Sequence, residues 1–183
     1  MIKQINNYAM QNGMVLGLFG IATLAAFKWS LSMPFMGVLF EIMLIASPVV
    51  ATFLTIKYRK TVIAESESFS FTHGFLHALF TGFYASIWIA LIVFIYLSYF
   101  DNGSIFAAYE QMLNTPATQE YLRQSGMNAQ LMEITGESGI KGLTEAMQSI
   151  PPTTYAALFL YLPLIVGPFI SAIIGLICRR AAR

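Results

Sequence analysis

Charged residues are scarce in this chain of 183 residues: 10% are Asp, Glu, Lys or Arg, against roughly 25% in an average soluble domain. The formal net charge is +1, and no basic arm is present that could bind nucleic acid. Hydrophobic residues make up 57% of the chain and aromatic residues 14%. This composition favours burial in a lipid bilayer and indicates no nucleic-acid partner.

Cysteine occurs once, at Cys178, which excludes an intrachain disulfide. Motifs of catalysis are missing too: there is no nucleophile elbow, zinc-protease helix, phosphate loop or dinucleotide fingerprint. Glu133 and Glu137 lie one helical turn apart, but charge on a solvated loop explains them. We therefore predict that the protein is not an enzyme and binds no cofactor.

Long apolar stretches dominate what is present. Roughly 20 apolar residues of helix cross a hydrocarbon core about 30 Å thick, and four stretches reach or nearly reach this length. The first follows Lys3, as a signal peptide would, but it is long for one and lacks a convincing cleavage site. We predict an all-α integral membrane four-helix bundle, a single domain over residues 1–183, with spans at about 8–27, 35–56, 75–99 and 154–178.

Two of these helices are expected to depart from a simple span. The third is predicted to begin near Phe71, and its length to Tyr99 of about 43 Å exceeds the hydrocarbon core. Its first two turns, with His73 and His77, are therefore expected in the cytoplasmic interface. Pro48 is expected to bend the second span, because proline removes a backbone hydrogen-bond donor.

Residues 101–152, between the third and fourth spans, are polar and mostly acidic. We predict three short amphipathic helices here: one over 104–114, one that begins at Thr115 and Pro116 and stops by Gly126, and one over 142–149. These helices are expected to lie on the bilayer surface or on the ends of the spans.

The positive charges predict the orientation. Most of them fall on one side of the predicted spans, and the acidic segment falls on the other. The first side carries Lys3, Lys57, Arg59, Lys60, Arg179, Arg180 and Arg183, with only Glu65 and Glu67 against them. Basic flanks stay in the cytoplasm. We therefore expect cytoplasmic N and C termini, a periplasmic segment 101–152, and a multi-pass protein in the inner (cytoplasmic) membrane of a bacterium.

Small residues recur at every fourth position on several predicted helices. The third helix has Gly74, Ala78, Gly82, Ser86 and Ala90, the fourth has Gly167, Ser171 and Gly175, and the first has Gly13 and Gly17. Such rows let helix backbones approach closely within lipid. We expect them to build the protein's own bundle; the alternative is that one row receives a partner's helix. A tight core argues against a wide, water-filled pore.

A polar face runs beside the row on the third helix. It consists of His73, His77, Thr81, Tyr84 and Trp88. Two histidines at this spacing can bind a metal, and Glu65 and Glu67 are close in sequence, but zinc sites usually have three or four protein ligands. We therefore predict no metal, and expect both histidines to hydrogen-bond water or lipid headgroups.

Glu41 is an acidic residue inside the second span. It is expected about 8 Å below the outer edge of the bilayer core. A carboxylate at such a depth costs a few kcal/mol, so residues of this kind are often functional. A proton carrier or a substrate contact is one interpretation. The others are that Glu41 is neutral, or that it meets Lys28 across the first turn.

The order of these features resembles one known family. Both termini are expected in the cytoplasm. Along the chain follow a basic turn from Lys57 to Lys60, the segment from Ser68 to Phe71 that leads into a long third helix, Gly82 in that helix, and Phe100-Asp101 before an acidic helical stretch. This is similar to the small four-span Bacteroidetes inner-membrane family called domain of unknown function 4199, over nearly the whole chain. The family has no established activity, so the resemblance implies no catalytic or ligand residues. Members encoded near membrane glycosyltransferases and other envelope genes imply an accessory role.

Three functions follow from these patterns. The first is a non-enzymatic membrane protein that contacts the lipid bilayer and assembles with itself or with another membrane protein of the cell envelope. The second is a small oligomeric transporter or channel, in which Glu41, the histidine face and a fourth helix kinked by Pro163 and Pro168 line a pathway between protomers. The third is an accessory subunit that presents a lipid-linked sugar to a membrane glycosyltransferase.

Overall fold

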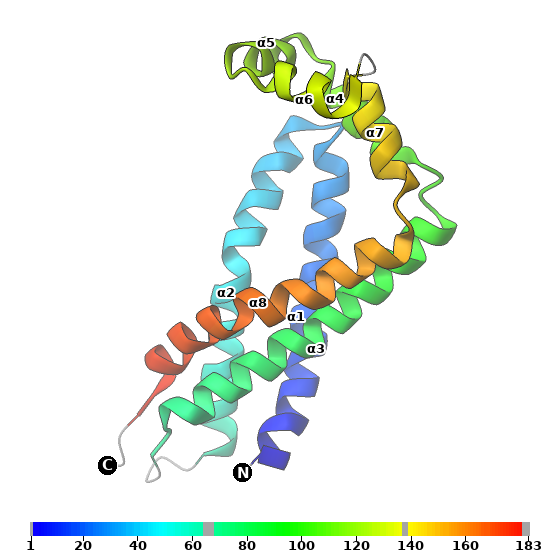
Figure 1. The fold of residues 1–183 in the computed structure, drawn as a ribbon. Helices are drawn as coiled ribbons and strands as arrows, with labels where there is room; N and C mark the ends of the chain where they lie inside the picture. The colour runs from blue at the N-terminus through cyan, green and yellow to red at the C-terminus, as the bar shows by residue number, and fades with distance from the viewer. Residues whose placement is uncertain (1, 64–67, 137–138, 181–183) are drawn as a thin grey trace.

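The computed structural model describes residues 2–63, 68–136 and 139–180 (Figure 1). These residues form eight helices and no β-strand, which confirms the all-α class. The helices are α1 (Ile2–Ser30), α2 (Pro34–Val62), α3 (Phe71–Tyr99), α4 (Ser104–Leu113), α5 (Pro116–Gln124), α6 (Met127–Thr135), α7 (Gly139–Ser149) and α8 (Pro152–Cys178).

Four of these helices, α1, α2, α3 and α8, are long and apolar enough to cross a membrane. They have 27 or 29 residues each, and at about 1.5 Å per residue they exceed a hydrocarbon core of about 30 Å. Their most apolar stretches are largely exposed on the molecule, which suits contact with lipid. The chain is therefore a multi-pass membrane protein. Pro34 occupies the first turn of α2, as its missing amide favours.

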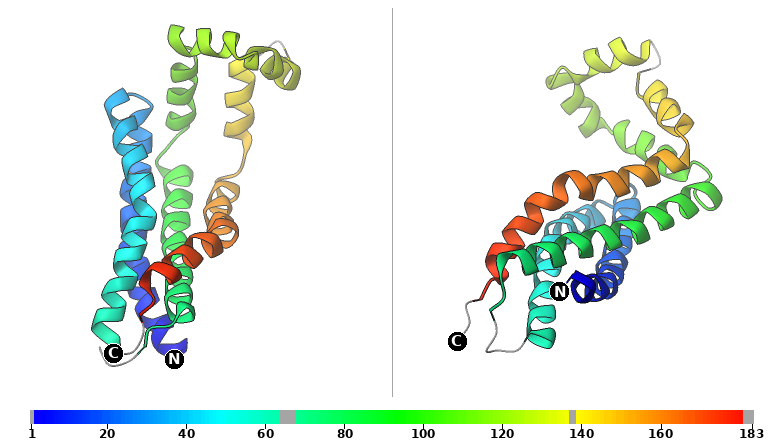
Figure 2. Two further views of the ribbon diagram at one scale, coloured as in Figure 1. Left: turned by 90° about the vertical axis from the view of Figure 1, so that its left-hand side faces the viewer. Right: turned by 60° about the horizontal axis from the view of Figure 1, so that its bottom comes forward.

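The central helix of the bundle is α3, which packs between α1 and α8. α1 and α2 form one antiparallel pair, joined by a turn at residues 31–33, and α3 and α8 form a second (Figure 1). The second pair crosses the first obliquely (Figure 2). α8 changes direction along its length (Figure 2), and Pro163 and Pro168 both lie inside it.

Glycines make both contacts of α3 close. A Cβ atom added to Gly13 of α1 would lie 3.0 Å from the Thr81 carbonyl oxygen. On the other side, a Cβ on Gly74 would lie 3.0 Å from Gly175 Cα, and one on Gly175 would lie 3.0 Å from the Phe75 nitrogen. Backbone atoms at these distances leave no room for a side chain.

The two ends of the bundle differ, and we name them by their residues. The basic end, where α1 begins and α8 ends (Figure 1), carries Lys3, Lys57, Arg59, Lys60 and Arg179. The cap end is the opposite one, beyond which the cap helices α4–α7 lie (Figure 1).

Polar contacts join three segments at the basic end. Arg59 Nη1 of α2 donates a hydrogen bond of 2.6 Å to the carbonyl oxygen of Cys178 in α8. Phe69 and Arg180 pair through two backbone hydrogen bonds of 2.8 Å, in an isolated antiparallel bridge. The side chains of Tyr58 and Phe69 are buried beside these contacts. The core of the bundle therefore lies towards the basic end.

The cap has four short helices in the described residues, one more than the sequence predicts. α6 was missed because its apolar periodicity is weaker than that of α5 or α7. Gly126 stops α5 as expected, but it also begins α6, in the left-handed conformation at φ 73°. The start of α4 is fixed by buried Asp101, whose Oδ1 accepts hydrogen bonds from Ser104 Oγ at 2.8 Å and the Ile105 amide at 3.1 Å.

Candidate functional site

His77 is the polar centre of the bundle, where α1, α2 and α3 meet. Its side chain is 0% exposed. Its Nδ1 lies 3.0 Å from Thr55 Oγ1 of α2, and Asn12 Nδ2 of α1 donates to its Nε2 at 3.1 Å. The imidazole also stacks on the ring of Tyr58, with 4.3 Å between centroids and 2° between planes.

The partners of His77 determine its protonation. Thr55 donates its one hydroxyl proton to the Ala51 carbonyl oxygen at 3.0 Å, so it accepts a proton from His77 Nδ1. Nε2 accepts from the Asn12 amide. The ring is therefore neutral, with its proton on Nδ1, and both nitrogens are occupied.

The expectation that His77 hydrogen-bonds water or lipid headgroups is therefore wrong. The close approach of α1 to α3 and the polar residues of α2 exclude lipid from the ring and replace those partners. Asn12, Thr55 and Tyr58 were not singled out from the sequence as its neighbours. Asn12 interrupts an otherwise apolar stretch, and this was the one available signal.

His73, one turn earlier, has a different environment. It is partly exposed, its Nδ1 lies 2.9 Å from Ser70 Oγ, and its ring stacks on Phe69. The Ser70 hydroxyl also accepts from the His73 amide at 3.3 Å, which caps α3. The two histidines thus have separate partners. Glu65 and Glu67, considered as further ligands, lie outside the described residues. Residues 2–63, 68–136 and 139–180 contain no group of three or more metal-ligating side chains.

The rest of the polar face on α3 turns mainly towards α1. The Tyr84 hydroxyl donates to Asn6 Oδ1 at 2.8 Å. The Thr81 hydroxyl is buried and has no hydrogen-bond partner among the described residues. Trp88 is 42% exposed. The face therefore serves mostly in helix packing.

Glu41 lies far from the histidines. It is exposed in the cap-end half of α2, about 10 Å from the start of the helix. Thr55, which contacts His77, lies about 21 Å further along α2. Within the described chain Glu41 has no ion pair and no side-chain hydrogen bond. Lys28, its expected partner, instead places its ammonium group 4.9 Å above the centroid of the Tyr96 ring.

The small-residue rows are only partly used in packing. Gly74 and Gly175 meet at the α3–α8 crossing, and Ala78, Ser86 and Ser171 are buried. A Cβ on Gly167 would make an ordinary contact with Leu79 Cδ1 at 3.7 Å. Gly82 has no neighbour within 4 Å of its Cβ position, so the row leaves the interface there.

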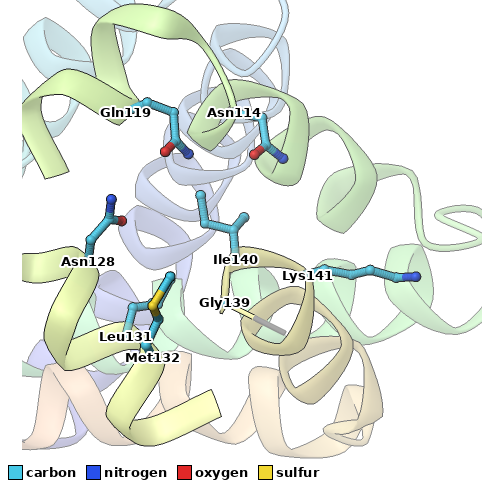
Figure 3. Close-up of a pocket in the computed structure, with 8 residues that line it drawn as sticks. All are labelled: Asn114, Gln119, Asn128, Leu131, Met132, Gly139, Ile140 and Lys141. Atoms are coloured by element: carbon cyan, nitrogen blue, oxygen red, sulfur yellow. The ribbon is translucent and has the colours of Figure 1, made fainter. Parts of the chain in front are cut away.

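A small pocket lies within the cap, with a volume of about 260 Å³ (Figure 3). Asn114, Gln119 and Asn128 surround it together with Ile140, while Lys141 extends away (Figure 3). The Gln119 amide donates to the Leu113 carbonyl and the Asn114 amide to the Glu110 carbonyl, each at 3.0 Å. The amides of these two residues are therefore partly committed to the backbone.

The ion pairs of the cap lie at its surface, whereas Asp101 is buried. Arg123 donates two hydrogen bonds to the Glu120 carboxylate, and Gln124 donates a third. These hydrogen bonds lower the pKa of Glu120 below its ordinary value, and those from Arg123 have a larger effect than the one from Gln124. Lys141 pairs with Glu145 at 3.8 Å. Such exposed pairs contribute little to stability.

A second, larger cavity lies at the cap end between α1, α3, α4, α7 and α8, with a volume of about 640 Å³. The described residues that line it are apolar or aromatic except for Lys28. We call it the cap-end cavity. The helices therefore pack tightly at the basic end, as the small-residue rows predict, and are separated by this cavity at the cap end.

Comparison with protein families fits this architecture. A family model described as "Protein of unknown function (DUF4199)" matches residues 11–180. The chain belongs to this family. The match begins at residue 11, within α1, and ends two residues after α8, so it includes most of α1, the other three long helices and the cap. No curated protein and no solved structure matches the chain.

Proposed function

We propose that this protein is a non-enzymatic assembly or accessory subunit of the bacterial cell envelope, which binds a transmembrane helix of another protein through the cap-end half of α2. The observation that carries this proposal is Glu41, an exposed carboxyl group on an apolar helix that has no hydrogen-bond or ion-pair partner among the described residues. None of residues 34–50 is buried, and every buried residue of α2 lies at or beyond Ala51. Phe40 in this half packs on Phe27 of α1, but the exposed face with Glu41, Ile42 and Ile45 is available for a further contact.

The energetics of Glu41 favour an occupied surface. An acidic side chain at the centre of a span costs about 2.5–3.5 kcal/mol on insertion scales, and less nearer the interface. Ile42 and Ile45 beside it are 59% and 74% exposed, so the neighbourhood is otherwise suited to lipid. A partner helix that donates a hydrogen bond to the carboxyl group would contribute about 1–2 kcal/mol.

A different protein suits this surface better than a second copy of the chain. A symmetric α2–α2 contact would bring two Glu41 side chains together, and as carboxylates they would repel each other. Ser47 carries a hydroxyl on this half of α2, but it already donates to the Met43 carbonyl at 3.1 Å. The partner should therefore supply its own donor, such as an amide, a hydroxyl or a basic side chain.

The transporter hypothesis has less support. Its polar groups do not converge, because Glu41 lies about 21 Å along α2 from Thr55, the residue of α2 that contacts His77. Both ring nitrogens of His77 are also occupied. A glycosyltransferase would be one partner of the kind proposed here.

We place the protein in the inner membrane with the basic end in the cytoplasm, because the two ends differ in charge and basic flanks stay in the cytoplasm.

Site-specific photo-cross-linking in native membranes tests the contact. A photoreactive residue at position 45 lies on the face of Glu41, and one at Ile173, which is 59% exposed on α8, is the matched control. We expect an adduct with another protein from position 45 only. Glu41→Leu should lower its yield roughly five- to thirtyfold, the loss of one interhelical hydrogen bond, whereas Glu41→Gln should retain most of it.

Two results would contradict the proposal. One is a set of adducts at position 45 that contains only lipid, or whose yield is the same in Glu41→Leu. The other is an adduct of twice the chain's mass, which would identify a second copy as the occupant. Thermal unfolding of each variant in detergent checks that the bundle remains folded.

A further inference from the structure

The cap-end cavity is a feature that the proposed contact on α2 does not use. Its described lining comes from α1, α3, α4, α7 and α8, and none comes from α2. Its volume of about 640 Å³ falls within the range of roughly 300–1,000 Å³ that is typical of ligand sites. The two surfaces can therefore be tested independently.

The cavity has the chemistry of a site for a hydrocarbon chain. Ile21 and Leu24 of α1 line it on the side of the membrane span, facing Ile92 and Val93 of α3. From Ile21 to Lys28, the lining of α1 extends about 10 Å along the helix axis. An apolar space of this size costs free energy when it is empty, and in a bilayer lipid chains are available to fill it.

Lys28 gives the cavity a single positive charge. Its ammonium group lies over the ring of Tyr96, and it has no ion pair among the described residues. Two carboxylates on the cap side of the bundle have other partners: Asp101 caps α4, and Glu110 accepts from the Thr144 hydroxyl at 3.1 Å. The charge is therefore available to an anion.

Cap helices separate this site from the ordinary lipid surface. Phe106 and Tyr109 of α4 and Met147 of α7 close the outer part of the cavity. The Tyr155 hydroxyl of α8 donates to the Met147 carbonyl of α7 at 2.7 Å, and this hydrogen bond holds α7 against α8 beside the cavity. A lipid held here would contact five helices, whereas a lipid on the outer surface touches one or two.

We propose that the cap-end cavity binds one anionic phospholipid, with an acyl chain among the apolar residues of α1 and α3 and the phosphate beside Lys28. The single uncompensated cation selects an acidic headgroup over a zwitterionic one, and the apolar walls select a chain over a soluble phosphate ester. The protein is thus a specific lipid-binding protein in addition to any protein contact that it makes.

The two tryptophans provide a direct test. Trp29 lines the cavity, whereas Trp88 does not. In Trp88→Phe, Trp29 is the single tryptophan, and in Trp29→Phe, Trp88 is. Each variant is reconstituted in phosphatidylcholine vesicles that contain a fixed mole fraction of a lipid with brominated chains. This brominated lipid is phosphatidylglycerol in one set of vesicles and phosphatidylcholine in the other. Brominated chains quench tryptophan fluorescence on contact.

We expect brominated phosphatidylglycerol to bind next to Trp29 roughly fivefold more strongly than brominated phosphatidylcholine, the effect of one lysine on an anionic lipid. Trp88 should show no such preference. Lys28→Gln in the Trp88→Phe background should abolish it, Lys28→Arg should retain it, and Lys57→Gln at the basic end should leave it unchanged.

Equal quenching of Trp29 by the two lipids would overturn the proposal, as would the same preference at Trp88 or a preference that persists in Lys28→Gln. The comparison of Trp29 with Trp88 does not depend on any Lys28 variant, so it decides the question even if those variants unfold. The result is also independent of cross-linking at α2, so either proposal can fail alone.

Discussion

The α3–α8 crossing offers the sharpest test of the packing, through the substitution Gly175→Ala. The added Cβ would lie 3.0 Å from both the Phe71 carbonyl oxygen and the Phe75 nitrogen. Both are backbone atoms of α3, so no flexible side chain can move aside. The helices would have to separate, which for overpacking of this kind costs about 1–3 kcal/mol.

Cys178 provides the assay. It is the chain's single cysteine, it is 0% exposed, and it lies one turn after Gly175. A thiol-reactive fluorogenic dye therefore reports the temperature at which α8 leaves the bundle in detergent. For a chain of this length, a loss of 1–3 kcal/mol corresponds to a fall of about 2–12 °C in the midpoint.

Gly82→Ala is the matched control on α3, because nothing lies within 4 Å of its Cβ position. Alanine is the better helix former, so this variant should be neutral or more stable by up to about 1 kcal/mol. Equal midpoints for Gly175→Ala and Gly82→Ala would refute the reasoning, since they would show that the α3–α8 distance does not limit side-chain size.

Two further predictions concern the core and the orientation. His77→Leu should destabilise the bundle by about 1–3 kcal/mol in the same dye assay, because it leaves the partly buried Asn12 amide without its partner and removes one of the two hydrogen bonds of the buried Thr55 hydroxyl. Adding Asn12→Leu should recover part of the loss, and strict additivity of the two losses would argue against the Asn12–His77 bond. Alkaline phosphatase inserted after Asn114 in the cap should be active, because that enzyme folds in the periplasm. If the enzyme is instead active only when it is inserted after Lys60 at the basic end, the orientation is the opposite one.

The existence and type of the four long helices follow from the sequence because hydrophobic length is a local property. A stretch of about 20 apolar residues has few stable alternatives in a bilayer, where each backbone group must be hydrogen-bonded within the segment. The start of α3 was predicted equally well, because the Ser70 side chain caps it. Failures were also local, as in α6, where weak periodicity hid a short helix.

Tertiary structure decided which polar side chains meet. His73 and His77 are equivalent by spacing, yet one is partly exposed and the other completely buried. Their difference depends on where α1 and α2 cross α3. In the same way Gly74 meets Gly175 at a crossing and Gly82 meets nothing, although both glycines belong to one row.

The sequence by itself therefore determined the class, the number of spans and the family of this protein, since each depends on hydrophobic length, charge asymmetry and the order of motifs along the chain. Only the tertiary structure decided that Glu41 has no partner in the described part of the chain, that Lys28 turns to Tyr96, and that a cavity opens at the cap end. These properties depend on the angles and distances between helices, which arise from all packing contacts together and have no signature in any one segment.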